Sequence, residues 1–180
     1  MEKKDLKPAG VFKYFEEICQ VPRPSKKEEK MIAYLKAFGA KHNLETKVDE
    51  AGNVLIKKPA TPGKENLQTV VLQSHIDMVC EKNNDVQHDF LTDPIETEID
   101  GEWLKAKGTT LGADNGIGVA TELAILADDS IEHGPLECLF TVDEETGLTG
   151  AFALKEGFMS GDILLNLDSE DEGDIFIGCA

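Results

Sequence analysis

The spacing of apolar residues predicts two helices in the first 42 positions. A first apolar stripe runs from residue 11 to residue 19, and Pro22 and Pro24 end it because proline cannot continue a helix. A second stripe, from residue 31 to residue 38, follows Ser25-Lys26-Lys27-Glu28, whose Ser-x-x-Glu spacing matches a capping box. We therefore expect a second helix that is capped at Ser25 and ends near His42.

Continuous apolar runs predict the strands of a sheet. Residues 69–73 are apolar on both faces, which is typical of a strand inside a covered sheet, and residues 136–142 and 163–167 form two more such runs. Residues 44–48 and 53–57 predict two strands joined by a turn, Asp100-Gly101 predicts a hairpin, and residues 115–126 predict a helix. Strands alternate with helices, so the pattern indicates an α/β fold.

Composition and charge narrow the function. The chain has 180 residues, 41% of them hydrophobic, which is enough for one packed domain. With 18 Lys and Arg against 35 Asp and Glu, its formal net charge is -17, which disfavours nucleic acid and anionic membranes and favours metal cations as partners. No apolar run approaches the roughly 20 residues of a spanning helix, and the charged start has no secretory signal, so we expect a cytoplasmic protein. The four scattered cysteines have no Cys-x-x-Cys pair and are interpreted as small buried thiols.

Polar side chains follow the ends of three predicted strands. His75 and Asp77 follow the first, Glu144 and Glu145 the second, and Asp168 the third. Ligand sites in open α/β sheets lie beyond the carboxyl ends of the strands, so an imidazole and several carboxylates should converge there. Asp114, within a glycine-rich turn before a predicted helix, adds a further carboxylate. Together these residues predict a metal site.

Each residue also has a simpler interpretation. His75 alone could be a core histidine, Glu144 and Glu145 a solvated turn, and Asp114 and Asp168 helix or turn caps. The glycine-rich turn could cradle a phosphate, but it lacks a Gly-Lys-Ser/Thr or Gly-x-Gly-x-x-Gly pattern and carries an acid. Their joint placement at strand and helix ends favours the metal site.

Four motifs resemble, in order and spacing, those of the dizinc aminopeptidase and carboxypeptidase family. The motifs are Ser74-His75-Ile76-Asp77-Met78-Val79, Gly108-Thr109-Thr110-Leu111-Gly112-Ala113-Asp114-Asn115-Gly116, Thr141-Val142-Asp143-Glu144-Glu145-Thr146-Gly147 and Asn166-Leu167-Asp168-Ser169-Glu170. The resemblance covers nearly the whole chain, from about Pro8, and implies a three-layer α/β/α zinc-peptidase-like catalytic domain.

The resemblance also implies residue roles. His75 and Asp168 would bind one metal ion, Asp114 would bridge two, and Glu145 would bind the second. Asp77 would orient His75, and Glu144 would be the general base. The implied cofactor is a pair of divalent ions, most simply zinc, with manganese or cobalt as alternatives. The implied reaction is the hydrolysis of dipeptides, Xaa-His dipeptides among them, by a homodimeric full-length enzyme.

The chain also departs from the family pattern. Family members take another metal-binding histidine from near the end of a longer chain, and a lid domain holds the substrate carboxylate. We therefore expect residues 1–180 to be the N-terminal part of a catalytic domain without its lid, binding metal weakly and inactive alone. The alternatives are an N-acyl amino-acid deacylase or carboxypeptidase of the same family, or a non-catalytic cation-binding module.

Overall fold

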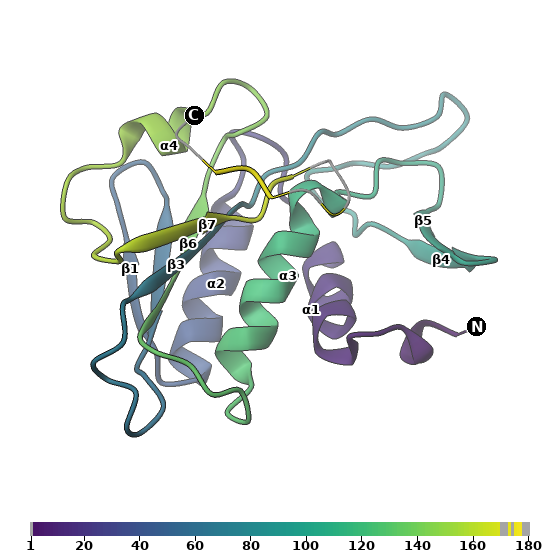
Figure 1. Ribbon diagram of the computed structural model, residues 1–180. Coiled ribbons are helices and arrows are strands. Elements are labelled where there is room, and N and C mark those ends of the chain that lie inside the picture. Colours follow the sequence, from purple (N-terminus) through teal and green to yellow (C-terminus); the bar gives the residue numbers. More distant parts are fainter. Residues whose placement is uncertain (1, 170–172, 174, 178–180) are drawn as a thin grey trace.

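A five-stranded mixed sheet forms the centre of the protein, in a computed structural model that describes residues 2–169, 173 and 175–177 (Figure 1). Its strands lie in the order β1 (Glu45–Val48), β2 (Val54–Lys58), β6 (Leu136–Thr141), β3 (Val70–His75) and β7 (Ile163–Asn166). The neighbours β6, β3 and β7 are parallel, whereas β1 and β2 pair antiparallel. The prediction that residues 69–73 form an interior strand is confirmed, because β3 lies between β6 and β7.

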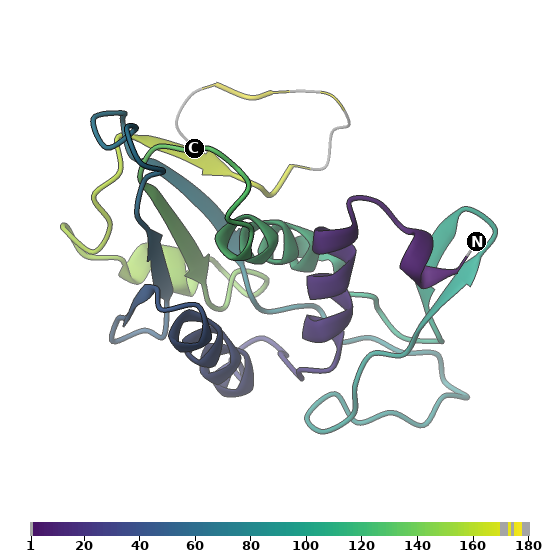
Figure 2. The ribbon, with the colours of Figure 1, turned by 90° about the horizontal axis from the view of Figure 1, so that it is seen from below.

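Helices cover one face of this sheet. Figure 2 shows α1 (Ala9–Cys19), α2 (Glu29–Lys41) and α3 (Ala113–Ala127) gathered on the same side. The helices α2 and α3 pack against the strands and α1 packs against α3, and the fully buried side chains of this core include Phe15, Leu35, Leu123 and Phe140.

The other face of the sheet carries a smaller apolar cluster. Leu55, Val71 and Leu139 point to this side, and they are covered by Leu154, Phe158 and Met159, which follow the short helix α4 (Thr149–Ala153). The sheet thus has a helical layer on one face and a thinner cover on the other, in agreement with the expected α/β fold.

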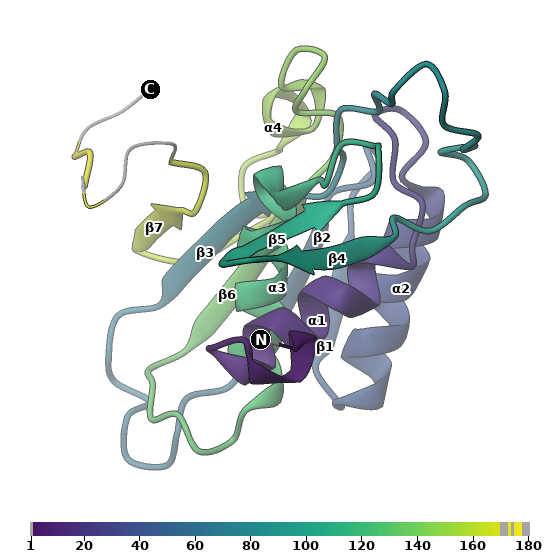
Figure 3. The same ribbon diagram turned by 90° about the vertical axis from the view of Figure 1, so that its right-hand side faces the viewer.

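A two-stranded hairpin projects away from the main sheet. It consists of β4 (Thr97–Asp100) and β5 (Trp103–Ala106), joined at Gly101 with a φ of 64° (Figure 1). The Asp-Gly turn predicted from the sequence is therefore confirmed. Figure 3 shows this hairpin apart from β7, which forms one edge of the main sheet. A single turn of 3₁₀ helix, η1 (Lys3–Asp5), precedes α1.

The predicted capping box at the start of α2 is wrong. The helix begins at Glu29, and its N-cap residue Glu28 makes no capping hydrogen bond with its side chain. Ser25 Oγ instead donates to Asp77 Oδ2 at 2.8 Å, and Glu28 Oε1 accepts the backbone N–H groups of Lys26 and Asp143. Both side chains are engaged by the loops at the strand ends, so they are not available to cap the helix.

The cysteines, the end of the described chain and the hydrophobicity of the helices can be compared with the sequence. Cys19 and Cys138 are buried free thiols as predicted, Cys80 is half-buried, and Cys179 lies outside the described residues. Residues 175–177, beyond β7, form no strand. Among the described residues, no helix combines the length and the apolar character needed to span a membrane.

Candidate metal centre

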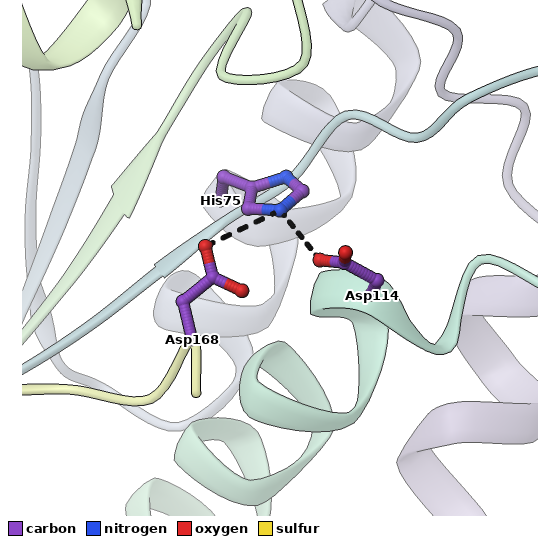
Figure 4. Close-up of side chains that lie close together, drawn as sticks. All are labelled: His75, Asp114 and Asp168. Atoms are coloured by element: carbon purple, nitrogen blue, oxygen red, sulfur yellow. Dashed lines mark hydrogen bonds and ion pairs between the residues drawn. The ribbon is translucent and has the colours of Figure 1, made fainter. Parts of the chain in front are cut away.

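Three elements bring three of the predicted metal-binding residues together at one edge of the sheet. His75 is the last residue of β3, Asp168 lies two residues beyond the parallel strand β7, and Asp114 lies in the first turn of α3. Figure 4 shows the carboxylates of Asp114 and Asp168 facing the same nitrogen of His75. The sequence-based expectation that these side chains converge is confirmed.

The convergence is close enough for a shared cation. His75 Nε2 lies 2.9 Å from Asp114 Oδ1 and 3.7 Å from Asp168 Oδ2. One potential ligand atom from each of these three residues lies within 4.8 Å of the other two. The imidazole is 1% exposed, whereas Asp114 is 60% and Asp168 is 27% exposed, so the group opens toward solvent on the carboxylate side.

Asp77 holds the opposite side of the imidazole and ties two loops to it. Its Oδ1 lies 3.2 Å from His75 Nδ1. The same carboxylate accepts the backbone N–H groups of Glu144 and Glu145, at 3.0 and 3.2 Å, and the hydroxyl of Ser25. Burial favours the neutral acid, but His75 and these donors outweigh it and lower the pKa of Asp77 to about 2. Asp77 is therefore a buried, ionised acceptor.

The surrounding carboxylates shift the ionisation of His75. Burial opposes protonation of the ring, but contacts with Asp77 and Asp114 and the charge of Asp168 together raise the pKa of His75 to about 9. The acids around this buried imidazole therefore form an environment that favours a positive charge.

The paired acids Glu144 and Glu145 occupy different positions. Glu144 Oε2 lies 3.9 Å from His75 Nε2, and burial together with the charges of Asp168 and Glu145 raises the pKa of Glu144. Burial and the charge of Asp114 likewise raise the pKa of Glu145. Glu145 is not one of the three side chains whose ligand atoms lie within 4.8 Å of one another, so the described residues assemble the first predicted ligand set more closely than the second.

The backbone around Asp114 explains why its side chain turns toward His75. Gly112 has a left-handed φ of 66°, and Asp114 and Asn115 have non-helical dihedral angles within the first turn of α3. Asn115 Oδ1 accepts the N–H of Gly118, so regular helical geometry begins only after Asn115. Asp114 thus projects from a turn, and the conformation at position 112 favours glycine.

A second, fully buried acidic group was missed by sequence reasoning. Carboxylate oxygens of Glu28, Asp77 and Asp143 lie within 4.8 Å of one another. They accept loop N–H groups and the hydroxyls of Ser25 and Thr146, so they act as hydrogen-bond acceptors that join the segment before α2 to the turn after β6. The Ser-x-x-Glu spacing was the available signal, and it was interpreted as a helix cap.

Comparison with known protein families identifies one that matches the chain. The model of the peptidase family M20/M25/M40 matches residues 71–179, which include every predicted site residue. The chain belongs to this peptidase family. The resemblance inferred from the four motifs is thereby confirmed.

Two members of the family are similar to the chain over nearly all of its length. The cytosol non-specific dipeptidase of Escherichia coli (strain K12) is 52% identical over 179 residues, which cover 99% of this chain and 37% of that protein. The structure of aminoacylhistidine dipeptidase from Vibrio alginolyticus is 55% identical, with a TM-score of 0.96 and coverage of 99% of this chain and 36% of that one. The chain thus spans just over a third of the length of both dipeptidases.

A more distant peptidase supports the same architecture. Aminopeptidase PepT from Bacillus cereus ATCC 10987 is 26% identical, with a TM-score of 0.76, and the similarity covers 90% of this chain and 43% of that one. The fold described above is therefore similar to that of an aminopeptidase as well as to that of a dipeptidase.

Proposed function

We propose that these 180 residues supply the metal-binding and proton-transfer groups of a metal-dependent dipeptidase. The single observation that carries the proposal is the position of His75 Nε2 beside the carboxylates of Asp114 and Asp168. In the proposed site His75, Asp114 and Asp168 would hold one divalent ion, and Asp114 and Glu145 would hold a second. One imidazole with several carboxylates suits zinc, with manganese and cobalt as alternatives.

The chemistry of the donor set fits a divalent cation. Asp114, Asp168 and Glu144 lie near Nε2 of His75, and burial together with the charges of neighbouring carboxylates raises the pKa of Glu144 and Glu145. A cation among them would relieve the repulsion between these charges. Asp77 contacts Nδ1 of His75. This contact orients the ring and leaves Nε2 directed at the proposed position of the metal ion.

Glu144 is the proposed general base. Its carboxylate stands beside the cluster, with Oε2 3.9 Å from His75 Nε2, where it can accept a proton from a water molecule at the site. Divalent ions, when bound, supply Lewis-acid activation of the peptide carbonyl and of water. Glu144 takes a proton from the attacking water and delivers it to the leaving amine, which releases two amino acids from a dipeptide.

The dipeptide substrate is proposed from the names of the two similar enzymes, a non-specific dipeptidase and an aminoacylhistidine dipeptidase. The name of the Escherichia coli protein also supports the proposal of a cytoplasmic location. The homodimer expected from the sequence stays a prediction. The rival functions are N-acyl amino-acid deacylation, carboxypeptidase activity and cation binding without catalysis.

A hybrid enzyme tests the reaction. This chain would replace the aligned segment of the Escherichia coli dipeptidase, to which it is 52% identical. We expect the hybrid to hydrolyse dipeptides, and Glu144→Gln to lower kcat by about 100- to 10,000-fold while bound metal, measured by mass spectrometry of the native protein, is retained. Glu102→Gln, in the exposed hairpin turn, is the matched control and should leave kcat unchanged.

The rival functions give different outcomes. Hydrolysis of N-acyl amino acids in preference to dipeptides would favour a deacylase, and hydrolysis of longer peptides would favour a carboxypeptidase. A hybrid that folds and binds metal but has no turnover with any of these substrates would favour a binding module. For the 180-residue chain alone we expect little activity, and appreciable dipeptide hydrolysis with zinc, manganese or cobalt would contradict that expectation.

A further inference from the structure

Arg23 places a guanidinium group between the two backbone segments that carry His75 and Asp114. The side chain is 2% exposed. Its Nη1 donates to the carbonyl oxygens of Ile76 and Asp77, both at 3.1 Å, and its Nη2 donates to the carbonyl oxygen of Gly112 at 2.5 Å. All three hydrogen bonds go to backbone carbonyls, and among the described residues the guanidinium makes no hydrogen bond to a carboxylate.

The three carbonyls belong to the two segments that carry the site. Ile76 stands between His75 and Asp77, and Gly112 stands two residues before Asp114. One planar group therefore fixes the end of β3 relative to the turn before α3. The backbone strengthens this connection, because the N–H of Met78 donates to the carbonyl oxygen of Arg23 at 3.2 Å.

Two glycines of the glycine-rich motif leave room for the guanidinium. A Cβ atom at Gly112 would lie 2.5 Å from Arg23 Nη2, and one at Gly116 would lie 2.7 Å from the same nitrogen. Both distances are too short for a side chain to be added without displacing Arg23. Gly116 has no positive φ, so this close approach is a specific reason for a small residue at that position.

The buried charge has a compensating environment. Burial disfavours the charged guanidinium and lowers the pKa of Arg23, while the negative charges of Asp77 and Asp114 act in the opposite direction. An isolated buried cation is costly unless hydrogen bonds and nearby charge offset that cost. Asp114, which would bind a metal ion, and Asp77, which contacts His75, thus also favour the charged form of Arg23.

We infer that Arg23 is a positioning residue that sets the separation between His75 and Asp114, and thereby the geometry of the metal centre. This inference rests on the proposed metal centre but concerns a residue that does not bind the ion. It assigns a role to an arginine between two prolines and explains the glycines at positions 112 and 116. A lysine cannot replace it fully, because an ammonium lacks the planar fork that reaches three carbonyls on two segments.

Arg23→Lys is the decisive variant because it keeps the charge and removes the fork. In the metal-free 180-residue chain, we expect faster amide hydrogen exchange at residues 76–78 and 112–116. In titrations with Co²⁺, we expect affinity to fall by about 10- to 100-fold, the range typical of residues that support metal ligands. The visible absorption of bound Co²⁺ should change as well, since it reports the arrangement of the ligands.

Lys58→Met is the matched control. Lys58 is a buried cation whose Nζ also donates to two backbone carbonyls, those of Ile125 and Asp128, but at the far end of α3. We expect faster exchange near residues 125–128 and an unchanged Co²⁺ spectrum. If both variants lose stability equally and only Arg23→Lys alters the spectrum, a general loss of packing is excluded.

The outcomes separate the inference from the proposed function. Unchanged exchange at residues 76–78 and 112–116 in Arg23→Lys would overturn the positioning role, whatever the metal does. Unchanged Co²⁺ affinity and spectrum would overturn its link to the metal centre. Absence of Co²⁺ binding by the unsubstituted chain would contradict the metal centre, while the exchange measurement would still decide whether Arg23 positions the two segments.

Discussion

Glu122 is a buried acid on α3 that the proposed reaction does not use. Its side chain is fully buried, and Ser74 Oγ donates to its Oε1 at 2.6 Å. Burial raises the pKa of Glu122 well above its usual value, more than the hydrogen bond from Ser74 lowers it. The group is therefore a neutral acid in the folded protein over a wide range of pH.

Replacing this acid should stabilise the protein increasingly as pH rises. The unfolded chain releases the Glu122 proton near pH 4.3, whereas the folded chain keeps it. The unfolding free energy of the unsubstituted chain therefore falls by about 1.4 kcal/mol per pH unit between the unfolded-state and the folded-state pKa of Glu122. Glu122→Gln keeps the acceptor for Ser74 and removes this loss. Chemical denaturation at pH 5 and pH 8 should show a larger gain in unfolding free energy at pH 8.

Glu137 provides the opposite control. It is 2% exposed, and its carboxylate lies 2.5 Å from Lys57 Nζ. Burial acts against ionisation, but Lys57 and Ser160 outweigh it and lower the pKa of Glu137. Its contribution to stability is thus present at neutral pH and lost as pH falls through the folded-state pKa, so Glu137→Gln should be destabilising at pH 8. A gain for both variants would contradict the assignment of opposite shifts.

At the scale of single elements, the carboxyl end of α3 depends on one cation. Lys58 Nζ on β2 donates to the carbonyls of Ile125 and Asp128, at 3.1 and 2.8 Å, where unpaired carbonyls and the helix dipole favour positive charge. Its ion pair with Asp129 adds little, because the Asp129 side chain is 97% exposed.

Lys58→Met should therefore lower the unfolding free energy by about 1–3 kcal/mol, the cost of leaving buried polar groups unpaired. Urea denaturation followed by circular dichroism measures this loss. Lys36→Met, an exposed position on α2, removes the same charge and should change stability by less than about 0.5 kcal/mol. Equal losses in the two variants would show that the carbonyl contacts of Lys58 are unimportant.

Elements could be predicted from the sequence where a local pattern determines them. The apolar stripes of α1 and α2, the Asp-Gly hairpin and the continuous run of β3 were all found this way. The capping box failed because the partners of Ser25 and Glu28 are Asp77 and Asp143, far away in the chain. The five-residue helix α4 is too short for its apolar periodicity to be recognised.

The candidate site was predictable for a different reason. Side chains that follow parallel strands meet at one edge of the sheet, so His75 and Asp168 could be grouped without knowing the strand order, and Asp114 was added because its glycine-rich turn precedes a predicted helix. Arg23 could not be found, because an arginine between two prolines has the pattern of a solvated turn. Only the assembled structure brings it beneath Gly112, 89 positions away in the chain.

At the scale of the whole molecule, β7 is an apolar strand at an edge of the main sheet. Ile163, Leu164 and Leu165 are 40–49% exposed, although Leu164 is paired with the buried Val71 on β3. Exposed apolar edges of this kind favour pairing with other chains.

Leu164→Lys should reduce self-association of the 180-residue chain, because a charged side chain on an edge strand opposes pairing between sheets. Sedimentation velocity at several concentrations measures the effect. Leu91→Lys is the control, since Leu91 is 52% exposed in a loop and the substitution adds the same charge. Similar behaviour of both variants would attribute any change to net charge alone.

The long sequence separations within the metal centre have a kinetic consequence. His75 and Asp114 are 39 residues apart, and Asp168 and Arg23 come from still more distant segments. Their contacts require several closed loops, so they should form late in folding, after the transition state. A cation that binds only the completed site would then slow unfolding and leave the refolding rate unchanged, so bound metal would extend the lifetime of the folded chain.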